Sequence, residues 1–346
     1  MRVAIVFNKD HKGTINVFGM QNREWYPKET IQMVVDALEW GGHEVELISS
    51  NRFLLAQLNK FLPKLSKRRP NGIVLNLALG VQGKCRYTHV PAILEVAGIP
   101  YTGSCPMGHA LAQDKVIAKQ IFISTHLPTP EYHVYMSPEI DSPFLKYPVI
   151  VKPRGEAASF GLKIVNDDAS LKEAVEGLFA EYKQPALVEE FIEGREVNVS
   201  VIGNNPPVAL PVLELAMENG PRAIYTYETK FPKKGDKKVK MICPANLPRE
   251  TTEYIQELAI QAFNALNVFD FGRVDFRLDK YNRPFILEMN SMASINPHSS
   301  FVTSAKAAGI SYNQLINRII EAAVERYSRE EPDFFKPLNN NNNNHS

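Results

Sequence analysis

Two short segments in the C-terminal part of the chain hold acidic and amide side chains at strand spacing. They are residues 272–277 (GRVDFR) and 285–290 (FILEMN). Side chains alternate between the two faces of a strand, so Glu288 and Asn290 share a face, and Asp275 can meet them at the edge of one sheet. Two carboxylates and an amide oxygen are hard ligands, which Mg²⁺ binds together with water and nucleotide phosphates. The alternative for these segments alone is a pair of ordinary strands with a solvated acidic edge.

Two cations could bind phosphate beside this cluster. Arg273 lies two residues before Asp275, and its guanidinium is always charged. Lys152 ends the apolar segment 148–152 (PVIVK), which is followed by a loop of mostly small residues at 154–161. Small residues let backbone N–H groups approach a phosphate, and the lysine adds a point charge. Ordinary hairpins have the same pattern, so this segment alone leaves both interpretations open.

A third segment, residues 186–196 (ALVEEFIEGRE), is acidic as well. It predicts a strand that ends in Glu189 and Glu190, with a turn at Gly194 before Glu196. Acidic side chains can accept hydrogen bonds from an adenine amino group or from ribose hydroxyls, and the backbone after them can pair with the edge of a base. The alternative is an edge strand with surface charges.

Length and composition indicate a globular protein. The 346 residues suffice for two or three domains, and a net charge of +1 gives no sign of a nucleic-acid partner. Three scattered cysteines fit neither a disulfide framework nor a zinc site, which favours a reducing, cytoplasmic compartment. No apolar stretch approaches the ~20 residues of a membrane helix. The apolar run at the N-terminus is too short for a signal peptide and predicts a first strand.

The alternation of apolar segments and amphipathic helices predicts an α/β (α+β) fold that begins with a parallel sheet. Strands are expected at 2–7, 43–48 and 72–79, with a helix at 28–41. Such an alternation places helices over a parallel sheet. The connection 8–27 is long for this kind of unit, and loops of that length in compact domains tend to be functional.

Two further units are expected after a proline-containing linker at 125–130. A helix is expected before the linker, at 108–123. After it, helices are expected at 169–182, 250–265 and 311–327, and strands at 148–152, 162–165, 186–191, 197–203 and 207–214. We therefore expect an N-terminal domain over 1–107, a central domain over 108–205 and a C-terminal domain over 206–336. Residues 337–346, mostly asparagine, have nothing to bury and are expected to be disordered.

The separate motifs follow one another in a distinctive order. They are Lys115, VKP with Lys152, the small-residue loop, VEEFIEGRE, YETKF with Lys230, GRVDF and LEMN. In this order they resemble the ATP-grasp superfamily in its D-alanine–D-alanine ligase-like branch, over essentially the whole chain. The resemblance implies an ATP-grasp fold with an N-terminal Rossmann-like parallel-sheet domain. It also implies an ADP-forming, ATP-dependent ligase that makes carbon–nitrogen bonds.

The resemblance implies cofactors, partners and site residues as well. We expect ATP and two Mg²⁺ ions that Mn²⁺ can replace, small-molecule substrates (an acid or enaminone plus an amino acid), no nucleic-acid or membrane partner, and a homodimer. The residues implied for ATP are Lys115 and Lys152 for the phosphates, Ser159 in the closing loop 155–161, Glu189 for the adenine amino group, the backbone of Glu190 and Ile192 for the base, and Glu196 for the ribose. The others are Asp275, Glu288 and Asn290 for the metal ions, Arg273 for the acyl intermediate and transferred phosphate, and Lys230 and Ser299 for the carboxylate of the acceptor amino acid. Of these, Arg273, Lys230 and Ser159 are expected to act in catalysis.

The sequence departs from the D-alanine–D-alanine ligase pattern where that family grips the ammonium of its first substrate. The glycine-rich loop with its glutamate is replaced by residues 7–13 (FNKDHKG), and the His-Gly after the third strand by 76–80 (NLALG). The loop serine and lid tyrosine that latch to this glutamate fall on Ala158 and Phe231. A Pro-Gly-Met after the metal asparagine becomes 293–295 (ASI).

These losses predict a first substrate without a free ammonium at that place, because an ammonium needs a carboxylate partner in a desolvated site. We therefore expect ligation in specialised metabolism. Two interpretations stay open: a peptide or amino-acid ligase, and the mycosporine-tailoring branch, which joins an amine to mycosporine-glycine. The alternatives are D-alanine–D-alanine ligation in cell-wall synthesis and a non-catalytic nucleotide-binding protein. The non-catalytic protein would be expected to have lost a metal ligand or Arg273.

Overall fold

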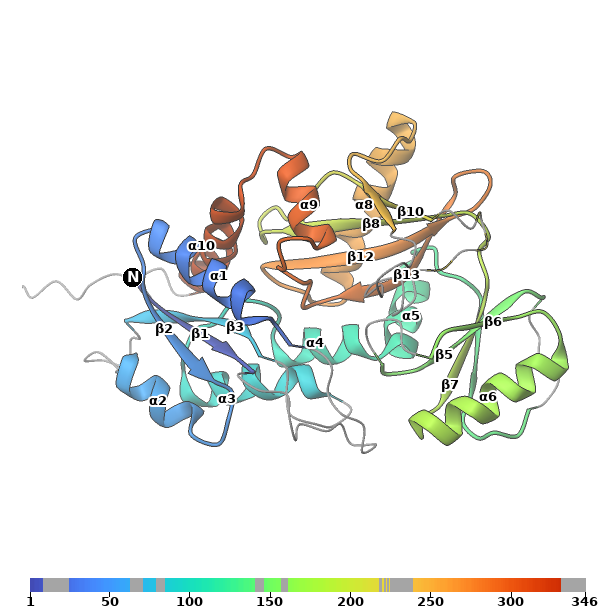
Figure 1. Cartoon of the computed structure of the whole chain (residues 1–346), viewed down its shortest axis with the longest axis horizontal. Helices are drawn as coiled ribbons and strands as arrows, with labels where there is room; N and C mark the ends of the chain where they lie inside the picture. Colours follow the sequence, from blue (N-terminus) through green and yellow to red (C-terminus); the bar gives the residue numbers. More distant parts are fainter. Residues whose placement is uncertain are drawn as a thin grey trace, which may run out of the picture.

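In the computed structural model, the described part of the chain forms three β-sheets with helices packed around them (Figure 1). It describes residues 1–8, 25–62, 71–78, 85–140, 146–156, 161–217, 220, 222, 224 and 239–330. The expectations for Ser159, Lys230, Ala158 and Phe231, for most of the loop 8–27 and for the tail 337–346 lie outside the described residues. The proposed domain boundaries stay a prediction.

The first sheet is parallel, and helices pack against both of its faces. Its elements, in chain order with the helices around it, are β1 (Arg2–Phe7), α1 (Lys28–Trp40), β2 (Glu44–Ser49), α2 (Leu54–Phe61), β3 (Gly72–Leu77), η2 (Arg86–Thr88), α3 (His89–Ala97) and the C-terminal α10 (Tyr312–Glu330). The strand order is β2-β1-β3. Val3 and Ile5 pack with α1 and α10, whereas Ala4 and Val6 pack with α2 and α3. Burial of both faces explains the uninterrupted apolar sequence of β1, and the predicted parallel sheet is confirmed.

The second sheet is antiparallel, with the order β4-β7-β5-β6. Its elements are β4 (Tyr132–Tyr135), β5 (Val149–Pro153), β6 (Lys163–Val165), α6 (Asp168–Tyr182) and β7 (Ala186–Glu190). Val151 and Val188 are buried against α6. Their neighbours Lys152 and Glu189 therefore lie on the opposite face of the sheet.

The third sheet is antiparallel and contains residues 272–277 and 285–290, which include the predicted metal ligands. Its elements are β8 (Arg195–Ile202), β9 (Val208–Ala209), β10 (Leu213–Ala216), β11 (Lys240–Ile242), β12 (Phe271–Leu278) and β13 (Pro284–Asn290), with α4 (Pro106–Gln113), α5 (Lys115–Ser124), α8 (Arg249–Ala265) and α9 (Ser300–Ala307) around it. The order is β11-β10-β8-β12-β13, with β9 paired to β8. Val274 and Phe276 belong to the core that α5 and α8 share, so Arg273 and Asp275 face the other way.

Two predicted elements are wrong in detail. The helix expected at 108–123 is two helices, because Asp114 between them is extended (φ −85°, ψ 100°) and caps the second. The strand expected at 207–214 is interrupted between β9 and β10 by Pro211, which has no N–H for a ladder. Among the described residues, no helix combines the length and the apolar character that crossing a membrane requires.

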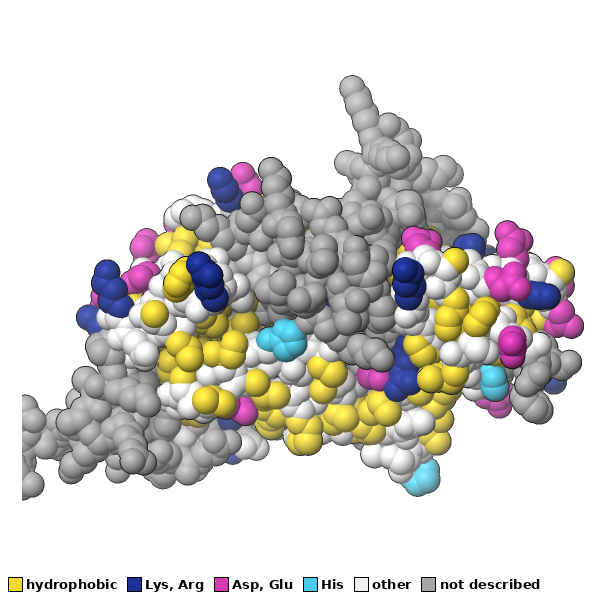
Figure 2. Space-filling model, turned by 90° about the horizontal axis from the view of Figure 1, so that it is seen from below, with side chains coloured by type: hydrophobic (Ala, Val, Ile, Leu, Met, Phe, Trp, Pro, Cys, Tyr) yellow, Lys and Arg dark blue, Asp and Glu magenta, His cyan; other side chains and the backbone are white. Residues whose placement is uncertain are grey.

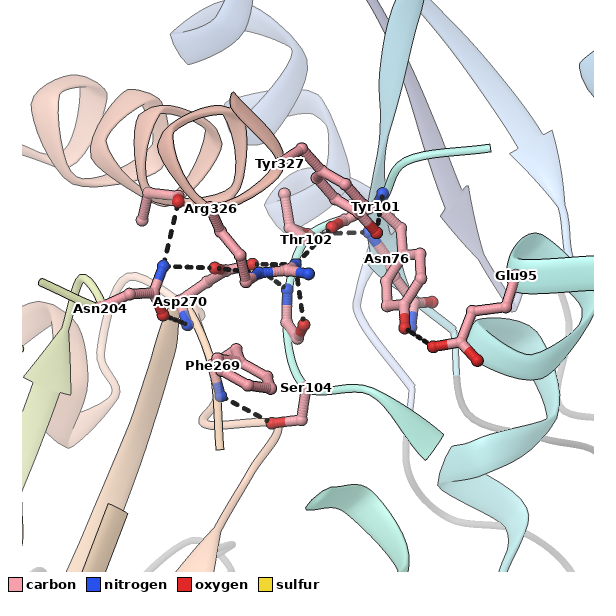
Figure 3. Close-up of polar contacts among 12 residues, drawn as sticks. Asn76, Glu95, Tyr101, Thr102, Ser104, Asn204, Phe269, Asp270, Arg326 and Tyr327 are labelled. Carbon is pink, nitrogen blue, oxygen red and sulfur yellow. Dashed lines mark hydrogen bonds and ion pairs between the residues drawn. The ribbon is translucent and has the colours of Figure 1, made fainter. Parts of the chain in front are cut away.

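A buried ion pair ties the first sheet to the third (Figure 3). Arg326 of α10 donates to both carboxylate oxygens of Asp270, at 3.1 and 2.9 Å. Asp270 also accepts from the Gly103 N–H at 2.7 Å and from Asn204 Nδ2 at 2.9 Å. Arg326 reaches the carbonyl of Tyr101 at 3.0 Å. Because Asp270 directly precedes β12, this junction fixes the start of that strand against the segment that leads into α4.

Exposed hydrophobic side chains occur on α3 and α4, two of the helices on the lower side of the molecule in Figure 1. They include Ile93, Val96 and Met107, of which Val96 is 90% exposed. Figure 2 views the molecule from below and shows hydrophobic side chains along this face, with the charged ones mostly towards its two ends.

Candidate functional site

Strands β12 and β13 bring the predicted metal ligands together at the edge of the third sheet. Asp275 and Glu288 are register partners, and so are Arg273 and Asn290. Asn290 Nδ2 donates to Asp275 Oδ2 at 3.0 Å. A register shift after Asp275 leaves Leu287 as an extra residue in β13, a bulge of the kind that re-aims side chains beside active sites. Both predicted strands are confirmed, whereas their role in metal binding stays a prediction.

The donor set fits Mg²⁺ in its chemistry. Asp275 and Glu288 offer carboxylate oxygens, and Asn290 offers an amide oxygen, which are the ligands that this hard cation prefers. Within the described residues, no group of three His, Cys, Asp or Glu could hold a metal ion. The third protein ligand would therefore have to be the amide, and water and phosphate oxygens would complete the shell.

Two predicted phosphate-binding cations are paired with these same carboxylates. Lys115 Nζ lies 3.4 Å from Glu288 Oε2. Arg273 donates through Nε and Nη2 to the two oxygens of Asp275, at 2.6 and 2.7 Å. Such a two-pronged contact holds both side chains in a defined orientation. Groups that could bind phosphate and groups that could bind metal thus alternate within one small region.

Glu189 lies in a buried charge cluster with two lysines. Lys152 Nζ is 2.8 Å and Lys119 Nζ is 3.1 Å from the same atom, Glu189 Oε1. The exposed fractions of the three side chains are 7%, 0% and 1% for Lys152, Lys119 and Glu189. Lys119 also donates to Thr129 Oγ1 at 2.6 Å, and Thr129 Oγ1 donates to the carbonyl of Ile286 in β13 at 2.8 Å. The cluster therefore links the second sheet, α5 and the edge of the third sheet.

Burial and charge oppose each other in this cluster. Burial lowers the pKa of Lys119 to about 8, although the Glu189 carboxylate favours the charged ammonium. Burial alone would raise the pKa of Glu189, but the ammonium groups of Lys119 and Lys152 outweigh it and lower that pKa. Glu189 is therefore a charged, buried carboxylate.

Lys119 was missed in the sequence analysis, although the sequence contained a signal. It lies four residues after Lys115 in the segment 115–124 (KVIAKQIFIS), where apolar side chains surround it. Residues four apart share a helix face, so both lysines point towards the same side of α5. A lysine inside an apolar helix that packs into a core requires a buried anion, and here that anion is Glu189.

The N-terminus of α5 is fixed to the strand that carries Lys152. Asp114 caps the helix by accepting from the N–H groups of Val116 and Ile117, at 3.0 and 3.2 Å. Arg154, two residues after Lys152, donates through Nε to both oxygens of Asp114 at 2.9 Å. This contact sets the position of the helix that carries Lys115 and Lys119 relative to β5.

Two of the predicted nucleoside-binding residues, Ile192 and Glu196, contact the buried Arg277 of β12. Arg277 donates to the carbonyl of Ile192 at 2.6 Å and to Glu196 Oε2 at 3.3 Å. The N–H of Glu190 donates to the carbonyl of Glu131 at 2.9 Å. The Ile192 carbonyl and the Glu190 N–H are therefore already engaged.

One cleft collects most of the predicted site residues. It holds about 870 Å³ of space, and its lining includes Lys115, Lys152, Glu189, Glu190, Ile192, Glu196, Arg273, Asp275 and Glu288. Asn290 lines an adjoining cavity of about 420 Å³ together with Lys115 and Glu288. Ser299 is the N-cap of α9 and accepts from the Val302 N–H at 3.3 Å, and its neighbour Ser300 lines the larger cleft. Ser159 and Lys230 lie outside the described residues.

Comparison with known proteins connects this geometry to a family. The model of the family described as D-ala D-ala ligase C-terminus matches residues 127–321. The chain is 40% identical over 336 residues to the uncharacterized protein y4sG of Sinorhizobium fredii, which covers 94% of this chain and 98% of that protein. It is 35% identical over 299 residues to the D-alanine–D-alanine ligase of Desulforudis audaxviator, covering 85% of this chain and 92% of the relative.

A solved structure extends the likeness to the fold. The chain is similar to the D-alanine–D-alanine ligase of Bacillus anthracis complexed with ATP, with a TM-score of 0.71 and 22% identity. The match covers 95% of this chain and 99% of that one. The predicted ATP-grasp fold is thereby confirmed.

Proposed function

Because the chain belongs to the D-alanine–D-alanine ligase family and is an ATP-dependent ligase of that type, we propose that it joins the amine of an amino acid to a phosphorylated first substrate. The γ-phosphoryl group of ATP passes to an oxygen of the first substrate, giving an acyl phosphate or its vinylogous equivalent. The amine attacks the activated carbon, the C–N bond forms, phosphate leaves with the electrons of the C–O bond, and the nitrogen releases a proton to the solvent. The protein contributes positioning and charge neutralisation, and no covalent enzyme nucleophile is needed.

The alternation of cations and carboxylates along one cleft is the observation that carries this proposal. Lys115 and Lys152 neutralise the phosphates, and Arg273 stabilises the transferred phosphoryl group and the intermediate. Each of these cations has a carboxylate within 3.4 Å, so all three are held at the place where the phosphates would lie. We expect the loop 155–161 to close over the triphosphate, with Ser159 donating a hydrogen bond to it from its side chain or backbone.

The nucleoside would lie between the second and third sheets. Glu189 would meet the adenine amino group, and Glu196 would hold the ribose. Since the Glu190 N–H and the Ile192 carbonyl already have partners, we infer that the base uses the Glu190 carbonyl and the Ile192 N–H.

Asp275, Glu288 and Asn290 would hold the metal, as two Mg²⁺ ions that Mn²⁺ can replace. When bound, the metal supplies positive charge at the phosphate oxygens. Lys230 and Ser299 would hold the carboxylate of the acceptor amino acid. For Ser299 the supporting observation is its place at the start of α9, one residue before the cleft-lining Ser300.

We infer a first substrate without a free ammonium from the ends of β1 and β3. Phe7 and Leu77, the last residues of these strands, are register partners, so their ends meet at one edge of the first sheet. The described residues that follow them are Asn8 and Ala78, and neither offers a carboxylate to an ammonium. An acid or an enaminone such as mycosporine-glycine satisfies this condition.

D-alanine remains the alternative first substrate, favoured by the name of the relatives in the comparison. A phosphate-release screen separates the two. Candidate acids and mycosporine-glycine are each combined with ATP, Mg²⁺ and every amino acid, and D-alanine is assayed alone. We expect phosphate release that requires both an acid or enaminone and an amino acid, and none with D-alanine alone. Steady formation of D-alanyl-D-alanine would contradict this proposal and would mean that another side chain, such as Asp10 or Glu24, had taken the place of the lost glutamate.

The same screen tests two remaining alternatives. A non-catalytic nucleotide-binding protein would release no phosphate with any pair of substrates. The presence of Arg273 and of all three predicted metal ligands speaks against it. We also propose a cytoplasmic homodimer, supported by the exposed hydrophobic side chains on α3 and α4 and testable by light scattering after size-exclusion chromatography.

A further inference from the structure

Lys119 and Lys152 share one oxygen atom of Glu189 but differ in what else they face. Lys152 lines the cleft in which the phosphates are proposed to bind. Lys119 does not line it, is 0% exposed and donates a hydrogen bond to Thr129 Oγ1 at 2.6 Å. Of these two lysines, therefore, one can turn towards a ligand and the other is fixed.

Nucleotide phosphates would compete with the carboxylates for the cations of the cleft. Asp275 and Glu288, if released from their cations, are predicted to have a divalent metal as a new partner. Glu189 is outside the predicted metal set. If Lys152 turned towards a phosphate, Glu189 would be a buried carboxylate that needs another cation, because an unpaired buried charge is strongly unfavourable.

We propose that Lys119 is a positioning residue that keeps the Glu189 charge paired while Lys152 moves from Glu189 to the nucleotide phosphates. The inference rests on the proposed ATP site and assigns a role within it to a residue that touches neither nucleotide nor substrate. Without the Lys119 ammonium, Lys152 would be the remaining lysine on Glu189 and would stay there. The nucleotide would then lose the Lys152 contact although Lys152 is still present.

Lys119→Met tests this by removing the ammonium while keeping an unbranched chain. We expect the dissociation constant for ATP, measured by isothermal titration calorimetry, to rise roughly ten- to a hundredfold, as in Lys152→Met. The constant for adenosine should change by less than about twofold, because adenosine has no phosphate for Lys152 to bind. Lys172→Met, at an exposed lysine of α6, is the matched control and should leave both constants unchanged.

The double variant Lys119→Met/Glu189→Gln tests whether Lys119 acts through the carboxylate. The Glu189→Gln variant has no carboxylate charge at position 189 for a lysine to neutralise. Adding Lys119→Met to it should therefore not weaken ATP binding further. Circular dichroism and the unfolding temperature confirm that each variant is folded. If Lys119→Met does not fold, Lys119→Gln, which keeps a donor for Thr129 and lacks the charge, replaces it.

Three results would overturn the inference. ATP and adenosine affinities that fall equally would show that Lys119 only supports packing of the pocket. An unchanged ATP affinity in the folded Lys119 variant would show that Lys152 does not depend on it. Additive losses in the double variant would show that Lys119 does not act through Glu189. If Lys152→Met also left ATP binding unchanged, the proposed nucleotide site itself would fail, which is a different outcome.

Discussion

Asp275 on β12 and Glu288 on β13 face each other as register partners, and each forms an ion pair with a cation proposed to bind phosphate. Arg273 holds Asp275, and Lys115 holds Glu288. A magnesium nucleotide carries both kinds of charge, so it can offer each carboxylate a metal and each cation a phosphate. When the nucleotide binds, each carboxylate can therefore exchange its cationic side chain for the metal, and each cationic side chain can exchange its carboxylate for a phosphate. No charged side chain of the site then has to be buried without a partner.

Glu288→Gln is expected to abolish turnover while the fold stays intact. The amide keeps the shape of the side chain but removes a negative charge from the proposed metal set. We expect kcat to fall by much more than tenfold, and a drop of tenfold already corresponds to ~1.4 kcal/mol in the barrier. Glu257→Gln, at an exposed glutamate of α8, is the control. Retention of more than about a tenth of the activity would remove Glu288 from the metal site.

Ser299→Ala should weaken binding of the acceptor amino acid. The hydroxyl oxygen accepts from the Val302 N–H, and its own proton remains to be donated to a carboxylate. We expect KM for the amino acid to rise, with a loss of about 1 kcal/mol in stability from the lost helix cap. Ser311→Ala removes the corresponding contact, Ser311 Oγ to the Gln314 N–H at 3.3 Å, at the start of α10. It should lower stability to a similar degree and leave KM unchanged.

The same assignment predicts selectivity among amines. An amine without the carboxylate loses a charge-assisted contact worth roughly 1.5–3 kcal/mol. Ethanolamine should therefore be a much poorer acceptor than serine in the phosphate-release assay. Equal rates for the two would show that neither Lys230 nor Ser299 binds the acceptor carboxylate.

ATP affinity should weaken as pH rises through the pKa of Lys119. Burial lowers that pKa from 10.5 to about 8, so the ammonium is charged below pH 8 and loses its proton above it. The charged and titratable groups around it are Glu189 of β7, Lys152 of β5, Tyr132 of β4 and Glu288 of β13. Once Lys119 is neutral, Lys152 is needed at Glu189, and the dissociation constant for ATP should rise between about pH 8 and 9.5. In Lys119→Met the constant should be high and flat over that interval; a flat profile in the unsubstituted protein would contradict the assignment.

Much of the fold and site could be predicted because each local pattern agreed with its tertiary context. The run 2–7 is apolar at every position except its first residue, and the structure buries both faces of β1. The spacing of Asp275, Glu288 and Asn290 along two strands predicted that their side chains meet, and the pairing of β12 with β13 brings them together. These features depend on side-chain alternation along single strands, which a sequence contains directly.

Other features depend on contacts between distant segments and could not be predicted in this way. The buried position of Lys119 depends on its contacts with Glu189, seventy residues later in the chain, and with Thr129. The break at Asp114 depends on Arg154, which holds the carboxylate that caps α5. The helix α9 was also missed, because its apolar residues pack into the core around β1 and α10 and show little periodicity of their own. Tertiary contacts decide such cases.

Removal of Arg326 should destabilise the protein far more than removal of Arg329, although both lie on α10. Arg326 is bonded to Asp270, which is 0% exposed, so Arg326→Met leaves a buried carboxylate without its cation. Breaking one side of a buried pair costs about 3–5 kcal/mol, to be read from urea unfolding. Arg329 pairs with Glu325 at the surface, where such a contact contributes about 0–1 kcal/mol, so Arg329→Met is the matched control. Because Asp270 precedes β12, Arg326→Met should also lower kcat in the population that remains folded. Equal stability of the two variants would mean that the junction between the first and third sheets does not depend on this ion pair.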